Sequence, residues 1–137
     1  MKAVNGVHHI GIAVDDLDAS IPVYAALFGS TLEHRDTVEE QGVEAASLAA
    51  GISRIELLAP LAPDTPVGRF LASRGPGLHH VAFEVADVAL ELDRLRRDGV
   101  RLIDERPRRG LFGLQVAFVH PEATGGVLAE FVSDDRH

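Results

Sequence analysis

The chain contains an internal repeat, and this repeat limits the folds that it can adopt more than any other feature. Residues 8–17 align with residues 79–88 at an offset of 71 positions, and each segment opens with two consecutive histidines. Near the ends of the copies, residues 55–57 correspond to residues 129–131 at an offset of 74. Two diverged copies, each of roughly 65 residues, therefore account for almost the whole chain.

Each copy predicts the same succession of elements, β-α-β-β-β. An apolar run rich in β-branched residues predicts a first strand at 7–14 and at 78–85. An aspartate after each strand can cap a helix. We expect one helix over about 17–28, although Pro22 lies in its second turn, and another from 88 to a stop at Gly99. Three strand-like runs follow in each copy: 31–37, 43–49 and 53–59, then 100–104, 114–119 and 127–132.

These elements predict the α+β fold class with two βαβββ modules. We expect a single domain over 1–137, because two halves of this size must share a core to be stable. Module 1 should cover about 5–60 and module 2 about 77–134. The linker between them, about 61–76, contains Thr65-Pro66, which is typical of the start of a short helix.

Two histidines and two glutamates occupy equivalent positions in the copies. His9 and His80 lie on the first strand of each copy, and Glu56 and Glu130 lie on the last strand. A single histidine or glutamate in a strand is more often structural, but a pseudo-twofold axis would bring all four to one point. Imidazole and carboxylate ligands suit an octahedral first-row cation with two open positions. The pattern predicts one divalent ion per chain, with Co(II) favoured and Ni(II), Mn(II) or Zn(II) possible.

His8 and His79 precede these candidates by one residue. Side chains alternate between the faces of a strand, so these two should point away from the metal. We expect them to have structural roles.

The composition excludes several classes of function. The chain has no cysteine, which excludes disulfides, thiolate ligands and cysteine nucleophiles. The net charge of −8 argues against nucleic-acid binding. No apolar run is long enough to span a membrane, and the first residues do not resemble a secretory signal. We therefore expect a cytoplasmic location with no nucleic-acid or membrane partner.

Positive charge is concentrated in one segment. Seven of the 12 arginines fall within residues 94–109, which is compatible with a solvated helix face or with anion binding. Arg108 and Arg109 lie in a loop rich in proline and glycine, where guanidinium groups can pair with phosphate or carboxylate. Gly110 and Gly113 would let the backbone approach a substrate closely. These four residues are candidate substrate contacts.

The chain resembles the methylmalonyl-CoA epimerase family of the vicinal-oxygen-chelate superfamily, which also contains glyoxalase I and the extradiol dioxygenases. The resemblance implies a half-open curved β-sheet around the metal site. It also implies interconversion of (R)- and (S)-methylmalonyl-CoA through a metal-stabilised enolate, as in propionate metabolism. Gln41 is a further candidate substrate contact, and we expect a homodimer. The segments that carry the resemblance are 8–20, 39–43, 55–61, 65–85, 105–110 and 119–131.

The resemblance also implies catalytic roles. Glu130 matches the family's glutamate that is both a metal ligand and the catalytic base. Some members carry a second catalytic glutamate at the position of Ala45. Glu44 is adjacent but should lie on the opposite face of its strand. Glu56 is therefore the candidate for the second catalytic group, with a bound water as the alternative.

Three other functions share parts of this pattern. A glyoxalase I (lactoylglutathione lyase)-like isomerase would use the same four ligands, but segments 39–43 and 107–110 favour the epimerase branch. An extradiol dioxygenase would bind Fe(II) with two histidines and one carboxylate, which leaves Glu56 unexplained. A drug-sequestering binding module of the same fold would not need a complete set of ligands.

Overall fold

The chain folds into two compact units. The computed structural model describes residues 4–134. The N-terminal unit contains residues 9–79, and the C-terminal unit contains residues 80–134 together with residues 4–8. The backbone N–H of Asn5 donates to the carbonyl oxygen of Glu84 at 2.8 Å, which attaches the start of the described chain to the C-terminal unit. Within the described range, no helix is both long and apolar enough to cross a membrane.

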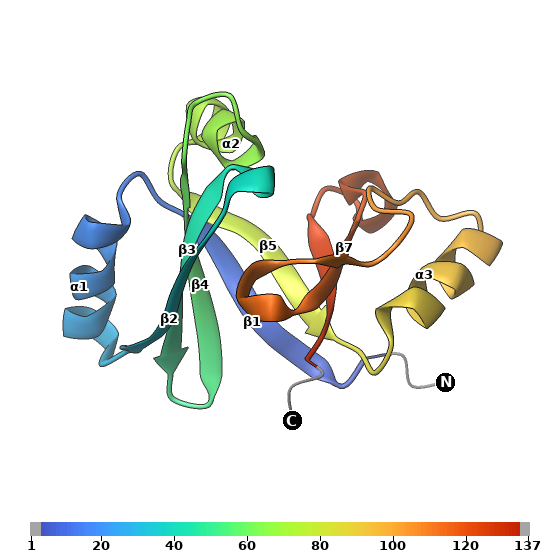
Figure 1. Cartoon of the computed structure of the whole chain (residues 1–137), viewed down its shortest axis with the longest axis horizontal. Coiled ribbons are helices and arrows are strands. Elements are labelled where there is room, and N and C mark those ends of the chain that lie inside the picture. The colour runs from blue at the N-terminus through green and yellow to red at the C-terminus, as the bar shows by residue number, and fades with distance from the viewer. Residues whose placement is uncertain (1–3, 135–137) are drawn as a thin grey trace. The chain divides into compact units, whose positions relative to one another are not determined.

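The N-terminal unit is a four-stranded sheet with α1 packed on one face (Figure 1). The strand order is β2-β3-β4-β1, with β2, β3 and β4 antiparallel and β1 parallel to β4. Its elements are β1 (Gly6–Ala13), α1 (Leu17–Phe28), β2 (Thr31–Val38), a 3₁₀ turn (Glu39–Gln41), β3 (Val43–Ala50), β4 (Ser53–Pro60) and α2 (Pro66–Arg74).

Helix α1 forms where the sequence predicts it. The side chain of Asp16 caps its start by accepting from the N–H of Asp18 at 2.9 Å, and Gly29 ends it in the left-handed conformation, with φ of 68°. The helix runs through Pro22 without interruption. The proline leaves only the carbonyl of Asp18 without a helical donor, and Asp18 is exposed, so water can satisfy that group.

The C-terminal unit repeats this arrangement, but three of its four strands are shorter than their counterparts. Its strand order is β5-β8-β7-β6, and Asp87 caps α3 by accepting from the N–H of Leu90 at 3.2 Å. Its elements are β5 (Gly77–Glu84), α3 (Val88–Arg97), β6 (Arg108–Arg109), a 3₁₀ turn (Leu111–Gly113), β7 (Gln115–Val119), a second 3₁₀ turn (Pro121–Thr124) and β8 (Ala129–Ser133).

The strand expected at 100–104 is wrong. This segment forms only an isolated bridge between Leu102 and Val119. The side chain of Asp104 accepts from the backbone N–H of Phe118 at 2.8 Å, so a carboxylate takes the donor that a ladder would use. The N–H groups of Ile103 and Asp104 both donate to the carbonyl of Phe118, each at 3.1 Å. The chain therefore crosses β7 at one point and pairs with it only later, through the short β6.

In each unit, one face of the sheet packs against the helix and the other face carries the predicted ligands. In the N-terminal unit, buried Leu48 and Leu57 belong to the core beneath α1, and Glu56 alternates to the opposite face. In the C-terminal unit, Phe131 packs in the core beneath α3, and Glu130 alternates to the opposite face.

Candidate metal centre

The N-terminal unit brings His9 and Glu56 together. Glu56 on β4 stands opposite Gly11 on β1, and Gly11 lies two residues after His9 on the same face of the strand. As a result, His9 Nε2 lies 3.4 Å from Glu56 Oε2, and the two side chains are only 4% and 7% exposed.

The C-terminal unit builds the same pair in the same way. Glu130 on β8 stands opposite Ala82, two residues after His80. His80 Nε2 lies 3.6 Å from Glu130 Oε1, and both side chains are buried. The ring of Phe118 packs edge-on against the His80 ring, with 5.6 Å between the centroids. The sequence repeat is thus a repeat of histidine–carboxylate pairs.

The chemistry of these pairs fits a divalent cation. His9, Glu56 and His80 are buried side chains of the types that ligate metal ions. Glu130 is a further buried carboxylate. Burial raises the pKa of Glu56 from its ordinary value of 4.5 to about 8, because a buried carboxylate without a nearby positive charge is poorly solvated. A bound cation would supply that charge.

The raised pKa of Glu56 predicts a pH dependence for the chelator-treated protein. The folded state holds a proton on Glu56 up to about pH 8, whereas the unfolded state releases it near 4.5. The stabilisation is therefore complete below about pH 4.5 and is lost as the pH rises through 8. This group alone should lower the free energy of unfolding by about 1.4 kcal/mol per pH unit between those values.

Urea unfolding of the chelated protein and of Glu56→Gln at several pH values measures this contribution. The neutral glutamine cannot titrate, so the difference in unfolding free energy between the two proteins should change with pH in that window. A constant difference would show that Glu56 has an ordinary pKa.

Ala45 lies on the same face of β3 as the centre. Ser47, two residues along the strand, stands opposite Glu56, and Ala45 is fully buried. Glu44 lies on the other face, as expected, because its carboxylate accepts from Arg35 Nε at 3.0 Å and Arg35 also binds Asp18 of α1. Sequence reasoning missed Ser47, although its position two residues after Ala45 would have indicated it.

His79 has a packing role, as expected from its position one residue before His80. Its ring packs edge-on against Phe70 of α2, with 5.0 Å between the ring centroids. Burial lowers the pKa of His79, which favours the neutral ring. The adjacent histidines 79 and 80 thus have different surroundings.

The loop that contains Arg108 and Arg109 has one arginine that pairs with a carboxylate and one that does not. Arg108 Nε lies 3.4 Å from Asp104 Oδ1, and the Arg108 guanidinium lies 5.7 Å from the centroid of the Phe118 ring. Arg109 is exposed, and no carboxylate pairs with it among residues 4–134. Arg108 is therefore partly neutralised, whereas Arg109 keeps its charge available.

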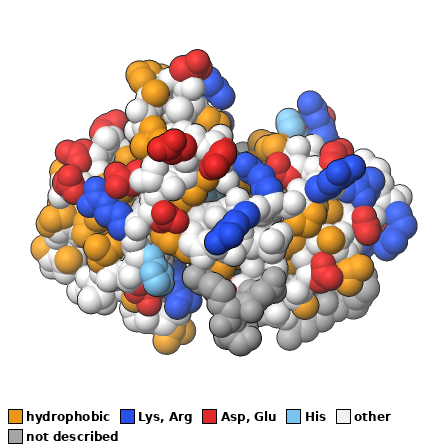
Figure 2. Space-filling view, viewed as in Figure 1, with side chains coloured by type: hydrophobic (Ala, Val, Ile, Leu, Met, Phe, Trp, Pro, Cys, Tyr) orange, Lys and Arg blue, Asp and Glu red, His pale blue; other side chains and the backbone are white. Residues whose placement is uncertain are grey.

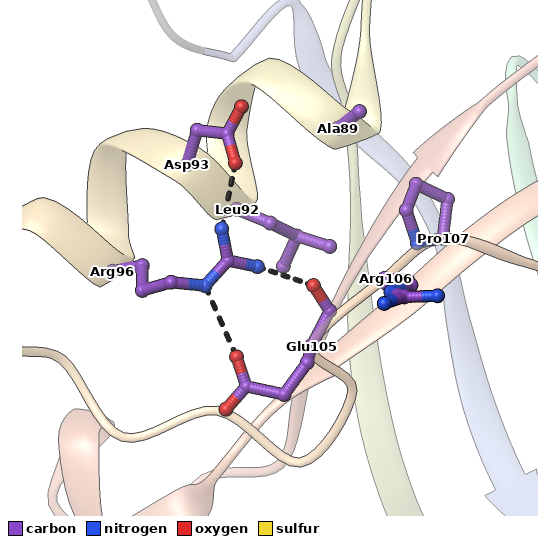
Figure 3. A pocket seen from close by; sticks show the side chains of 7 residues that line it. All are labelled: Ala89, Leu92, Asp93, Arg96, Glu105, Arg106 and Pro107. Carbon is purple, nitrogen blue, oxygen red and sulfur yellow. Dashed lines mark hydrogen bonds and ion pairs between the residues drawn. The ribbon is translucent and has the colours of Figure 1, made fainter.

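Arg96 and Arg106 line a pocket of about 430 Å³ between α3 and residues 105–107 (Figure 3). Arg96 binds Asp93 at 2.6 Å and both the side chain and the carbonyl oxygen of Glu105, so its charge is compensated. Arg106 has no carboxylate partner in the described part of the chain. Arg94 and Arg101 also pair with carboxylates, at 3.0 and 2.6 Å. Most of the predicted basic patch is therefore internally paired.

Local structure explains why glycine occupies positions 110 and 113, the two glycines predicted as substrate contacts. A Cβ at Gly110 would lie 2.7 Å from Val116 Cγ2, so Gly110 allows β6 to pack on β7. Gly113 has a φ of 75°, which favours glycine. Phe112, which sequence reasoning missed, is left-handed with a φ of 59°, an uncommon conformation for a bulky residue. Gln41 lies half-buried in the turn between β2 and β3.

Comparisons with known proteins agree over most of the chain. A family model described as the Glyoxalase/Bleomycin resistance protein/Dioxygenase superfamily matches residues 8–118. The uncharacterized protein YqjC of Bacillus subtilis (strain 168) is 42% identical over 136 residues, covering 98% of this chain and 97% of that protein. The human protein named methylmalonyl-CoA epimerase, mitochondrial, is 32% identical over 125 residues, covering 90% of this chain and 71% of that protein.

A solved structure is similar over both copies of the repeat. It is described as methylmalonyl-CoA epimerase in complex with methylmalonyl-CoA and NH4+. Its sequence is 40% identical, its TM-score is 0.92, and the match covers 98% of this chain and 97% of that one.

Proposed function

The chain belongs to the methylmalonyl-CoA epimerase family, a family of isomerases with the vicinal-oxygen-chelate fold, and we propose that it interconverts the (R) and (S) forms of methylmalonyl-CoA. The observation that carries this proposal is the pair of buried histidine–glutamate sets at equivalent places in the two units. The cysteine-free composition is compatible with a cytoplasmic location, which remains our expectation.

We propose that His9, Glu56, His80 and Glu130 together hold one divalent cation, with Co(II) favoured. Nitrogen and oxygen donors in this combination suit first-row cations and leave positions for two substrate oxygens. A cation bound there would act as a Lewis acid that stabilises the negative charge developing on the thioester oxygen.

The carboxylates then have a second task. Epimerisation requires a group that removes the α-proton from one side of the carbon and a group that returns a proton on the other side. We assign removal and return to Glu130 and Glu56. Ala45 offers no acid or base, and Glu44 is bound to Arg35 on the far face of its strand.

α-Proton exchange into deuterated water tests the reaction itself. The metal-loaded protein should exchange the α-proton of methylmalonyl-CoA and equilibrate its two forms. The panel should also contain other acyl-CoA thioesters and the methylglyoxal–glutathione adduct. Turnover of the adduct with no exchange in any acyl-CoA would overturn the epimerase in favour of a glyoxalase I-like isomerase. Absence of all turnover and of metal binding would favour a binding module.

We propose that Arg109, together with Arg106, binds the phosphates at the nucleotide end of the CoA ester. Both guanidinium groups are exposed and lack carboxylate partners in residues 4–134, and the chain as a whole repels an anion through its net charge of −8. Arg108 is held by Asp104, so we give it the smaller part in this contact.

The double variant Arg106→Ala/Arg109→Ala should raise KM for the full CoA ester about 10- to 100-fold with little change in kcat. A phosphate contact far from the reacting carbon is equally strong in the ground and transition states. The corresponding pantetheine thioester, which lacks the nucleotide, should be unaffected. Arg101→Ala, which removes an exposed arginine already paired with Glu122, is the matched control. An equal loss on both thioesters would refute the phosphate role.

A further inference from the structure

The N-terminal unit buries one hydroxyl on the sheet face that carries Glu56. Ser47, in the middle of β3, is only 6% exposed. Its neighbours Ala46 and Leu48 belong to the core beneath α1, so Ser47 alternates to the opposite face of the strand. Within residues 4–134, no group forms a hydrogen bond with this hydroxyl. Ser47 is therefore a buried donor that the chain itself does not use.

A second buried serine of the same unit provides a comparison. A buried hydroxyl usually has a hydrogen-bond partner, because burial removes the water that would otherwise bind it. Ser30, between α1 and β2, also lacks a partner in the described part of the chain, and its Oγ is fully enclosed. The Ser47 hydroxyl is not enclosed in this way and lies beside a proposed metal ligand. Its partner can therefore come from outside the chain.

The register of β3 and β4 places this hydroxyl next to the metal centre. Ser47 stands directly opposite Glu56 in the antiparallel pair. Side chains that oppose each other in this way have Cβ atoms about 4.5–5.5 Å apart. The residues next to this pair on the same face, Ala45, Leu58 and Gly11, have no side chain that can donate a hydrogen bond. Ser47 is thus the donor that β3 presents to a group bound beside Glu56.

We propose that the Ser47 hydroxyl binds the free carboxylate of the acyl-CoA substrate, an inference that rests on the proposed function. A substrate that chelates the cation through its thioester oxygen and one carboxylate oxygen leaves the second carboxylate oxygen to be bound by the chain. A buried anionic oxygen without a hydrogen bond is unfavourable, so it requires a donor. Ser47 thereby selects malonyl-type thioesters, which carry this carboxylate, over simple acyl-CoA thioesters.

The overall charge of the chain gives this carboxylate no help. The net charge is −8, and Figure 2 shows acidic side chains over much of the visible surface of the N-terminal unit, at the left of the view. The long-range field therefore repels an anion, and recognition of the carboxylate depends on local hydrogen bonds. A hydroxyl supplies such a bond without adding a positive charge that would compete with the cation for Glu56.

Calorimetric titration of the metal-loaded protein with two ligands tests the proposal. Malonyl-CoA has both the thioester and the carboxylate, whereas propionyl-CoA lacks the carboxylate. Ser47→Ala should weaken the binding of malonyl-CoA about 10- to 100-fold, as expected for the loss of a hydrogen bond to a charged group, and leave the binding of propionyl-CoA unchanged. Ser30→Ala is the matched control and should bind both ligands as the native chain does.

Two variants of equal shape separate the hydroxyl from the volume of the side chain. Ser47→Thr keeps the hydroxyl, and Ser47→Val replaces it with a methyl group of similar size. The threonine variant should bind malonyl-CoA at least about 10-fold more tightly than the valine variant. Titration with Co(II) should give all these variants the metal affinity of the native chain.

Equal binding of malonyl-CoA by Ser47→Thr and Ser47→Val, or an equal loss of both ligands in Ser47→Ala, would overturn the proposal. So would a loss of metal affinity in Ser47→Ala, because Ser47 would then act by holding Glu56. These measurements do not require turnover, so they are independent of the proposed reaction. A chain whose affinity for malonyl-CoA depends on the Ser47 hydroxyl, but which exchanges no α-proton, would support the contact and contradict the epimerisation.

Discussion

His80→Ala should lower the affinity of the chain for a divalent cation by more than about 100-fold and reduce epimerisation by at least about 1,000-fold. The imidazole is one of four proposed ligands, and its Nε2 lies 3.6 Å from the carboxylate of Glu130. His79→Ala is the matched control, because the adjacent ring packs against Phe70 and should affect stability without affecting metal content. Calorimetric titration with Co(II) measures both variants.

The stoichiometry in this experiment separates one shared ion from two independent ions. If the two pairs hold a single cation, His9→Ala and His80→Ala should each reduce the metal content from one ion per chain to none. If each unit held its own ion, each variant would keep one ion at the intact pair. Full metal content in either variant would show that its histidine is not a ligand.

The repeat made most of the fold predictable, because each module is defined by local patterns. The strands 7–14 and 78–85, the capped helices and the three later strands of the first copy follow from periodicity and capping residues. The same alignment identified the candidate ligands, since equivalent strand positions in the two copies have the same register, Glu56 opposite Gly11 and Glu130 opposite Ala82.

Features set by contacts distant in sequence were not predictable. The carboxylate of Asp104 replaces a strand pairing at Phe118, and nothing in residues 100–104 indicates this. The left-handed conformation of Phe112 is likewise unexpected from its residue type, since bulky residues rarely adopt it. Arg96 and Arg108 pair with carboxylates, and only the side-chain positions in the structure reveal this. The number of arginines in the sequence therefore overstated the unpaired positive charge.

Glu130→Gln should reduce interconversion by about 100- to 10,000-fold, as expected for the loss of a general base. Glutamine has nearly the same volume and retains an oxygen that can ligate a cation, so the fold and part of the metal affinity should survive. Glu56→Gln should have an effect of the same order if Glu56 serves the other side of the α-carbon.

Exchange of each substrate form separately distinguishes the two carboxylates. If each glutamate serves one side, each variant should stop exchanging the α-proton of one form and continue to exchange that of the other. Proton NMR in deuterated water follows both reactions. The two variants should then have opposite preferences, a pattern that metal loss alone cannot produce because it would slow both forms equally. If Glu56→Gln remains fully active on both forms, Glu56 is only a ligand and water serves the second side.

Ala45→Glu in the Glu56→Gln background extends the test, since position 45 lies on the same strand face as Ser47, opposite Glu56. Recovery of the lost exchange in that double variant would show that the missing activity was that of a base.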